Sequence, residues 1–124
     1  MNEAGVKSED IGFVNTHGTA TRYNDEMESK AIAWAGLSDV PANSLKGYVG
    51  HTLGASGVLE TILCLSQIRT ATVYATAGFE TLGVPCQMNV SSKHRPMGIL
   101  RCVKTASGFG GCNAARVLSA DELE

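Results

Sequence analysis

Histidine is scarce in this sequence, so each occurrence can be weighed as a candidate for proton transfer or hydrogen bonding. The 124 residues contain three histidines. His17 stands where a short apolar run ends and a Gly-Thr turn begins, and α/β sheets form ligand crevices at the carboxyl ends of strands. His51 lies in GHTLGASG, directly before a predicted helix. Taken alone, His17 also fits a residue that caps a strand end and His51 an ordinary loop residue, whereas His94 is expected in a solvated loop.

Two charged residues accompany the second histidine. Lys46 precedes His51 by five positions in the same glycine-rich segment, and Glu60 is the only carboxylate in an otherwise apolar helical stretch. Burying an unpaired carboxylate costs several kcal/mol, and Lys46 is the nearest cation along the chain that could reach it. Two interpretations therefore stay open: Glu60 pairs with Lys46, or it points into a solvent-filled gap.

The glycine-rich stretches indicate close backbone approach rather than nucleotide binding. The segment GFGG at residues 108–111 lacks the third glycine of a dinucleotide loop and precedes a predicted strand, and GHTLGASG has no Lys-Ser/Thr pair for a phosphate. Glycines of this kind let the backbone approach a ligand closely. Consecutive N–H groups in SGFGG could also point at a developing oxyanion.

The elements that must position these residues alternate between strands and helices. A β-branched apolar run or alternating pattern marks the strands, and apolar spacing with capping residues marks the helices. The predicted order is a strand at 11–16, a helix from the cap Asn24 to the stop at Gly36, a strand at 40–45, a helix at 56–70, a mixed region at 71–100, and strands at 101–106 and 114–119. The glycine turn between the last two predicts a terminal hairpin, and the whole order predicts an α/β layered fold.

The two predicted helices differ in their apolar surfaces. In the first helix, Met27, Ala31 and Trp34 recur on one face, as in an amphipathic helix. In the second, apolar residues cover most of the circumference, which predicts burial on all sides. Those residues are Val58, Leu59, Ile62, Leu63, Leu65 and Ile68.

Composition limits the classes of protein that the chain can belong to. A hydrophobic fraction of 44%, a charged fraction of 18% and a net charge of −2 predict one compact domain and exclude disorder and nucleic-acid binding. No apolar run approaches ~20 residues, so no membrane span is expected. The four cysteines form neither a CxxC pair nor a metal site, and the N-terminus shows no signal peptide. We therefore expect free thiols in the cytoplasm and no bound metal.

Three motifs occur together in a fixed order: VNTHGTAT, KGYVGHTLGASGVLE and SGFGGCNA. From about residue 8 to 119 the chain resembles the C-terminal portion of a β-ketoacyl synthase, the decarboxylating condensing enzyme of fatty-acid and polyketide assembly. The resemblance implies the C-terminal half of a thiolase-like layered fold, in which two similar α/β halves pack together. Residues 1–124 are then expected to be the C-terminal domain of such an enzyme.

The resemblance also implies roles for individual residues. His17 matches the first catalytic histidine of the family and His51 the second, and both would donate hydrogen bonds to the malonyl carbonyl as an enolate forms. Lys46 matches the lysine five positions before the second histidine and is expected to be catalytic together with the two histidines. Glu60 matches the glutamate that pairs with this lysine in the family, which favours the ion pair.

The glycine turn matches the family's GFGG motif. The resemblance assigns Phe109, between Gly108 and Gly110, a backbone N–H in the oxyanion hole and a ring that gates the acyl pocket. The family commonly has Asn-Ser-Phe before this motif, whereas this chain has Thr-Ala-Ser at 105–107, so one gating aromatic residue is missing. The common Pro-x-Gly-Asp is Arg-Tyr-Asn-Asp at 22–25, which indicates a divergent subfamily.

The family's nucleophilic cysteine is absent from this chain. It belongs to an N-terminal motif resembling TACSS, and Cys64, Cys86, Cys102 and Cys112 all lack that context. We therefore expect a fragment that lacks the N-terminal half and is inactive alone, and whose exposed core face makes it a homo-oligomer. The resemblance implies an acyl carrier protein as partner, substrates carried on its phosphopantetheine, and no other cofactor. The alternative is a non-catalytic partner subunit similar to a chain-length factor.

Overall fold

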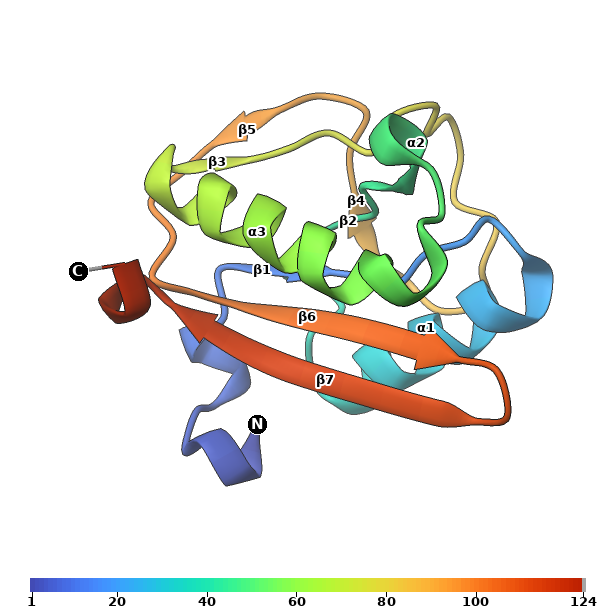
Figure 1. Ribbon diagram of the computed structural model, residues 1–124, viewed down its shortest axis with the longest axis horizontal. Helices are drawn as coiled ribbons and strands as arrows, with labels where there is room; N and C mark the ends of the chain where they lie inside the picture. Colours follow the sequence, from blue (N-terminus) through green and yellow to red (C-terminus); the bar gives the residue numbers. More distant parts are fainter. Residues whose placement is uncertain (124) are drawn as a thin grey trace.

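Five strands form a mixed sheet that occupies the middle of the molecule (Figure 1). The computed structural model describes residues 1–123. Across the sheet the order is β4-β2-β1-β6-β7, parallel except where β6 and β7 pair antiparallel. The strands are β1 (Phe13–Asn15), β2 (Pro41–Asn43), β4 (Asn89–Val90), β6 (Arg101–Gly108) and β7 (Cys112–Ser119). The α/β layered fold and the predicted order of its main elements are confirmed.

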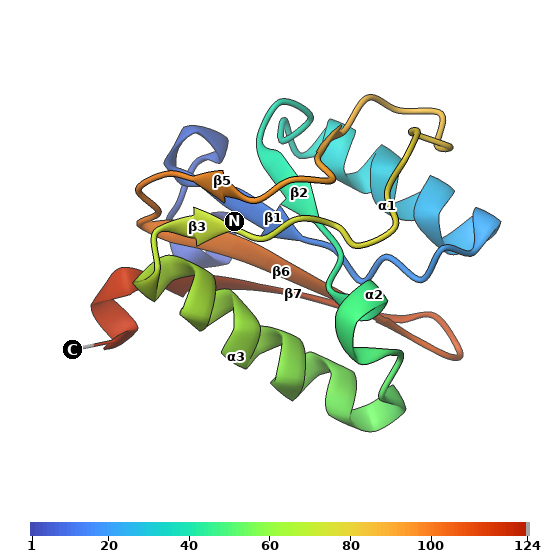
Figure 2. The ribbon, with the colours of Figure 1, turned by 90° about the horizontal axis from the view of Figure 1, so that it is seen from above.

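Helices cover both faces of this sheet, α1 on one side and α3 on the other (Figure 2). The helices are α1 (Arg22–Trp34), α2 (Lys46–Val49) and α3 (Ser56–Arg69), with 3-10 turns η1 (Asn2–Ala4), η2 (Ser8–Asp10), η3 (Leu53–Ala55) and η4 (Ala120–Leu123). The mixed region contains β4 and a separate antiparallel pair, β3 (Thr72–Val73) with β5 (Arg95–Pro96). No helix among residues 1–123 is long and apolar enough to cross a membrane.

Alternate residues of the strands supply two hydrophobic clusters, one under each helix. Successive side chains of a strand point to opposite faces of the sheet. Phe13 therefore packs toward α3 and Val14 toward α1, and both are fully buried. The cluster on the α3 side is Phe13, Cys64, Ile68, Val73, Ile99, Cys102 and Leu118. The cluster on the α1 side is Ile11, Val14, Ile32, Leu37, Ala42 and Val103.

The first helix begins earlier and buries a different face than the sequence predicted. It starts at Arg22 after Thr21, so Asn24 is not its cap, although Gly36 follows its end with φ +71° as expected for a C-terminal stop. The face with Met27 and Trp34 is the outer one, and Trp34 is 91% exposed. The helix instead buries Glu28, Ser29 and Ile32. The Glu28 carboxylate lies beneath the turn after β1, where it accepts the backbone N–H of His17.

The prediction that the second helix is buried on all sides was wrong. One face of α3 packs on β6 and buries Cys64, Gln67 and Ile68. The opposite face leaves Val58 68% and Ile62 58% exposed, because residues 1–123 place no further layer outside α3. An apolar face of this size is typical of a surface that another protein segment covers.

The terminal hairpin is longer than predicted. β6 and β7 each contain eight residues, and Gly108 pairs with Cys112 at the end of the ladder. The connection is therefore only three residues long, and Gly110 and Gly111 both have φ near +80°. Glycine adopts such left-handed conformations without a steric cost, which explains the density of glycine in this turn.

Candidate active site

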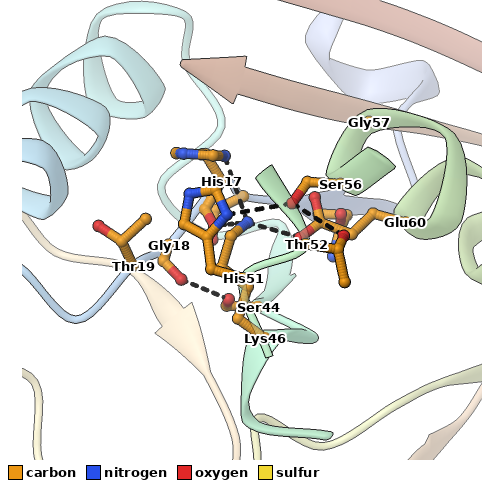
Figure 3. A network of polar contacts seen from close by, with 12 residues as sticks. His17, Gly18, Thr19, Ser44, Lys46, His51, Thr52, Ser56, Gly57 and Glu60 are labelled. Carbon is orange, nitrogen blue, oxygen red and sulfur yellow. Dashed lines mark hydrogen bonds and ion pairs between the residues drawn. The ribbon is translucent and has the colours of Figure 1, made fainter. Parts of the chain in front are cut away.

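His17 lies just beyond the carboxyl end of β1, as its sequence context predicted. The neighbouring parallel strand β2 ends at Asn43, so the segment that carries Ser44 and Lys46 leaves the sheet at the same edge. His51 follows α2, and α3 begins soon after it. Figure 3 shows the resulting group, in which His17, Lys46, His51 and Glu60 come together from separate elements.

The turn at His17 is held by the carboxylate of Glu28. The backbone N–H of His17 donates to Oε1 over 2.9 Å, and that of Gly18 donates to Oε2 over 2.7 Å. The hydroxyl of Thr105 on β6 donates to Oε1 over 2.6 Å, and the Asn24 amide donates to Oε2 over 3.2 Å. Four donors satisfy a carboxylate that is only 5% exposed, so the turn is tied to both α1 and β6.

Gly18 allows this turn to approach the chain after β2. Its φ is +43°, and an added Cβ would lie 2.6 Å from Cβ of Ser44. The Ser44 hydroxyl donates to the Gly18 carbonyl over 2.7 Å, which links the two segments. A side chain at position 18 is therefore excluded both by conformation and by space.

Lys46 joins His17 to Glu60. Its ammonium lies 2.5 Å from Oε1 of Glu60, donates to the carbonyl of His17 over 2.5 Å, and lies 3.2 Å from Nδ1 of the same histidine. Glu60 is 1% exposed, so of the two interpretations of this carboxylate the structure supports the ion pair. A second ammonium, that of Lys104 on β6, lies 2.6 Å from Oε2 of Glu60.

His51 meets His17 edge to face. The two ring centroids are 5.1 Å apart with an interplanar angle of 84°. The backbone N–H of Leu53 donates to Nδ1 of His51 over 3.1 Å, and the Ser56 hydroxyl lies 3.3 Å from the same nitrogen. Leu53 has φ +51°, which is an unfavourable backbone conformation for a residue with a branched side chain. This strained residue is the one whose N–H donates to His51.

These contacts determine the tautomer of both rings. An ammonium and a backbone N–H can only donate, so Nδ1 of His17 and Nδ1 of His51 are acceptors and the proton of each neutral ring is on Nε2. Burial and then the Lys46 charge lower the pKa of His17 below its ordinary value, and Glu28 opposes them. The arrangement therefore provides an imidazole Nε2–H donor at His17 that stays neutral near pH 7.

An open hollow of about 840 Å³ lies beside these residues. Lys46, His51 and Gly18 line one side of it, and residues 76–84 line another. Gly47 lets α2 approach this second segment, because an added Cβ would lie 2.8 Å from the carbonyl oxygen of Ala77. The volume is in the range of small-molecule sites.

The glycine turn lies apart from the residues that line this hollow. Phe109 is at the tip of the β6–β7 hairpin with 97% of its surface exposed, between Gly108 at the end of β6 and Gly110 in the turn. Its roles in an oxyanion hole and as an acyl gate remain predictions.

None of the four free cysteines contacts His17 or His51 within the described part of the chain. Cys64 and Cys102 are buried in the core, and the contact with Cys102 together with burial raises the pKa of Cys64, so it is a poor nucleophile. Cys112 is exposed beside the hairpin turn. Among residues 1–123, no three His, Cys, Asp or Glu side chains are grouped as a metal site would require.

Sequence reasoning did not identify Glu28, Thr105 or Lys104 as part of the site. Glutamate in an amphipathic helix and lysine in a strand usually face solvent, so their identity alone gives no signal. The pairing of β1 with β6 brings Thr105 and Lys104 near His17, and the packing of α1 on the sheet brings Glu28 to Thr105. His94, by contrast, lies apart in an exposed position where Nδ1 accepts the N–H of Ala75.

Comparison with protein families gives a match over most of the chain. The family model described as "Beta-ketoacyl synthase, C-terminal domain" matches residues 1–80. The chain is 36% identical over 125 residues to 3-oxoacyl-(acyl-carrier-protein) synthase 2 of Vibrio cholerae, covering 94% of this chain and 30% of that protein. It is 32% identical over 123 residues to the tetracenomycin polyketide synthase ketoacyl synthase alpha subunit of Streptomyces glaucescens, covering 96% and 29%.

Solved structures show the same fold. A β-ketoacyl synthase from Burkholderia phymatum superposes with a TM-score of 0.90 at 29% identity, over 95% of this chain and 29% of that one. The ishigamide ketosynthase/chain length factor gives 0.89 at 29% identity, over 95% and 30%. A type II polyketide acyl-carrier protein in complex with its ketosynthase gives 0.89 at 27% identity, over 96% and 30%. The chain therefore spans about three-tenths of the length of the proteins it matches.

Proposed function

The chain belongs to the β-ketoacyl synthase family, and from this premise we propose that it forms the C-terminal part of an enzyme that condenses malonyl and acyl thioesters with loss of CO2. The observation that carries the proposal is the pair His17 and His51, whose Nδ1 atoms are both occupied as acceptors and whose rings lie 5.1 Å apart. Two neutral imidazoles with protons on Nε2 form a pair of donors for one carbonyl oxygen.

The two donors act on the charge that develops during decarboxylation. The bond between the malonyl carboxylate and the α-carbon breaks, CO2 leaves, and the electron pair delocalises onto the thioester oxygen as an enolate. Hydrogen bonds from His17 and His51 to this oxygen strengthen as the negative charge grows, so they stabilise the transition state more than the substrate. The loss of one such donor costs about 3–4 kcal/mol in comparable sites.

Lys46 and Glu60 have a supporting role in this proposal. The Lys46 ammonium fixes the ring of His17 through Nδ1 and through the carbonyl of the same residue. Glu60 neutralises part of that charge and is itself held by α3. The turn of Gly108, Phe109 and Gly110 would supply the oxyanion N–H and the acyl gate once the second half of the pocket is in place.

The second half of the reaction needs a nucleophile that this chain lacks. The enolate carbon attacks an acyl group held as a thioester on a cysteine, the new C–C bond forms, and the cysteine leaves as a thiolate. We propose that this cysteine belongs to the remaining portion of a synthase, which packs on the exposed face of α3. The 124 residues alone are then inactive.

The substrates proposed for the complete enzyme are thioesters of an acyl carrier protein. A carrier protein bound to its ketosynthase is present in one of the similar structures, and this supports the assignment. The carrier's phosphopantetheine brings the thioester, and no other cofactor takes part in the proposed reaction. The relatives include both 3-oxoacyl synthases and polyketide synthases. The proposal therefore names acyl thioesters as a class of substrate and no particular acyl chain.

A non-catalytic partner subunit is the alternative, and a ketosynthase/chain length factor is among the similar structures. The complete group of His17, Lys46 and His51 favours the catalytic function, because a subunit that only shapes a tunnel has no need for paired donors.

The test joins the chain to the nucleophile-bearing portion of a related synthase and measures CO2 released from malonyl-carrier protein. His17→Ala is expected to lower decarboxylation by 10²–10³-fold while leaving acylation of the cysteine within a factor of about two of the parent. His94→Ala is the matched control and should retain the parent rate, since His94 is exposed and away from the site. Equal loss of both half-reactions in His17→Ala would contradict the role assigned, as would decarboxylation that survives it.

A further inference from the structure

Lys104 is a buried lysine that the function proposed above does not use. It lies on β6 with 4% of its surface exposed, although lysine is almost never fully buried unless it is paired. Its strand is central in the sheet, between β1 and β7, so the side chain cannot reach solvent along an edge. A charged ammonium in this place requires a partner that compensates for the lost hydration.

The partner is the same carboxylate that Lys46 uses. The Lys104 ammonium lies 2.6 Å from Oε2 of Glu60, while Lys46 lies 2.5 Å from Oε1. Lys104 also donates to the carbonyl of the adjacent Thr105. The buried carboxylate of Glu60 on α3 therefore bridges two ammonium groups, one from α2 and one from β6.

This bridging leaves a net positive charge next to His17. Two ammoniums and one carboxylate sum to +1 if all three are ionised. On the other side of the turn that carries His17, Glu28 contributes a negative charge. Its carboxylate accepts hydrogen bonds from the backbone N–H groups of His17 and Gly18. Among residues 1–123, His51 is the one further titratable group in contact with the ring, which it meets edge to face.

We propose that Lys104 is a positioning residue: by holding the second oxygen of Glu60, it keeps the Lys46 ammonium incompletely neutralised, and this charge keeps the His17 ring neutral with its proton on Nε2. The effect of Lys104 on the protonation of His17 is inferred from the contacts within this chain alone. Its consequence for condensation rests on the proposed function.

Removing the second ammonium would change the charge balance at His17. If Lys104 were uncharged, Lys46 and Glu60 would form a neutral pair, and Glu28 would then favour a protonated His17. A protonated ring would carry a hydrogen on Nδ1 directed at the Lys46 ammonium, so the contact of 3.2 Å would become repulsive and the ring would lose its support. Like the Lys46 charge, the Lys104 charge lowers the pKa of His17, whereas Glu60 and Glu28 raise it.

The test follows the titration of His17 by NMR in the 124-residue chain. Lys104→Met removes the charge and keeps an apolar side chain of similar length, and we expect the titration midpoint of His17 to move upward. Lys104→Arg restores the charge and should return the midpoint toward the parent value. Lys93→Met removes a lysine that is exposed, and should leave the midpoint unchanged. A folded Lys104→Met chain with an unchanged midpoint would overturn the proposal.

A measurement on the unaltered chain covers the case in which Lys104→Met does not fold. The nitrogen chemical shift of the Lys104 side chain reports whether it is an ammonium or an amine. The proposal expects an ammonium at pH 7, and an amine there would overturn it without any variant.

Activity of the joined protein distinguishes this proposal from the proposed function. If decarboxylation occurs, Lys104→Met should move its acidic limb to higher pH, and Lys104→Arg should restore the parent profile. If the His17 midpoint shifts as expected but no malonyl thioester is decarboxylated, the role of Lys104 stands and the proposed function fails.

Discussion

The rings of His17 and His51 approach within 5.1 Å at an angle of 84°, although one follows β1 and the other follows α2. Each ring is fixed from behind at Nδ1, by the Lys46 ammonium in one case and by the N–H of Leu53 in the other. The pair is therefore built from two different supports that produce the same tautomer. Such prior orientation is what a site needs to stabilise charge without reorganising during the reaction.

Replacing Glu60 by Gln should destabilise the chain strongly. The substitution leaves two buried ammoniums without a carboxylate, and breaking a buried ion pair in this way costs about 3–5 kcal/mol. Chemical denaturation measures the change in the free energy of unfolding. Glu26→Gln is the control, because its pair with Arg22 is on the surface and should contribute no more than about 1 kcal/mol. Similar losses in the two variants would contradict the burial of charge at Glu60.

Replacing Gly18 by Ala should also destabilise the chain. The new Cβ would approach Ser44 to 2.6 Å in a backbone conformation with φ +43°, a strain of about 1–3 kcal/mol. Gly83→Ala is the matched control, since its added Cβ would meet nothing within 4 Å and its φ is not positive. The same denaturation experiment should show a change within about 0.5 kcal/mol for the control. A neutral Gly18→Ala would mean that the turn is looser than described.

Truncation of two phenylalanines should have very different effects on the stability of the chain. Phe13 is fully buried under α3, so Phe13→Ala should cost about 3–5 kcal/mol of stability. Phe109 is 97% exposed, and Phe109→Ala should leave the free energy of unfolding within about 0.5 kcal/mol. In the joined protein, Phe109→Ala should nevertheless reduce condensation if the ring gates the acyl pocket. A change in stability at Phe109 would instead indicate a structural role.

The stability of the chain should fall with acidification partly through His17. Its pKa is lowered by folding, so the unfolded chain binds a proton more readily, and the stabilisation present above the ordinary pKa of about 6.5 is lost as the pH falls through the folded value. His17→Gln removes this contribution, and its unfolding free energy should fall less between neutral and acidic pH. Gln87→Ala alters an exposed side chain that carries no charge and should retain the parent slope. A steeper acid dependence in His17→Gln would contradict a His17 pKa that is lowered by folding.

The apolar face of α3 should make the isolated chain self-associate. Val58 and Ile62 are mostly exposed on this face, and the double change to Lys should shift the chain toward monomer in sedimentation velocity. Leu100→Lys alters an exposed apolar side chain outside α3 and should leave association as it is. A parent chain that sediments as a single monomer at all concentrations would contradict the prediction.

The order of the main elements could be read from local signals. The site residues His17, Lys46, His51 and Glu60 could be read only from the resemblance that the three motifs together carry. Strand and helix patterns act over a few residues, and the glycines mark the breaks between them. The buried faces of α1 and α3 could not be read in this way. Trp34 and Ile62 are apolar but exposed, while Glu28 is charged but buried, because the layer that each residue meets is set by the whole sheet.

Lys104 shows the same limit at the level of the site. The sequence correctly predicts its strand, but nothing nearby in the sequence indicates that its ammonium shares a carboxylate with Lys46. The contact depends on β6 pairing with β1 while α3 crosses the same face. Hydrogen-bond and ion partners that are far apart in sequence become visible only when the topology is known.

The position of β6 also orders events during synthesis. β6 pairs with β1 through Phe13 and Cys102, so the sheet joins two segments that lie far apart in the sequence. A nascent chain that has emerged only as far as Leu100 has Glu60 and Lys46 but neither Lys104 nor the partner strand of β1. The ribosome must translate through β6 before this long-range closure is possible, and until then the apolar residues of β1 lack this partner strand.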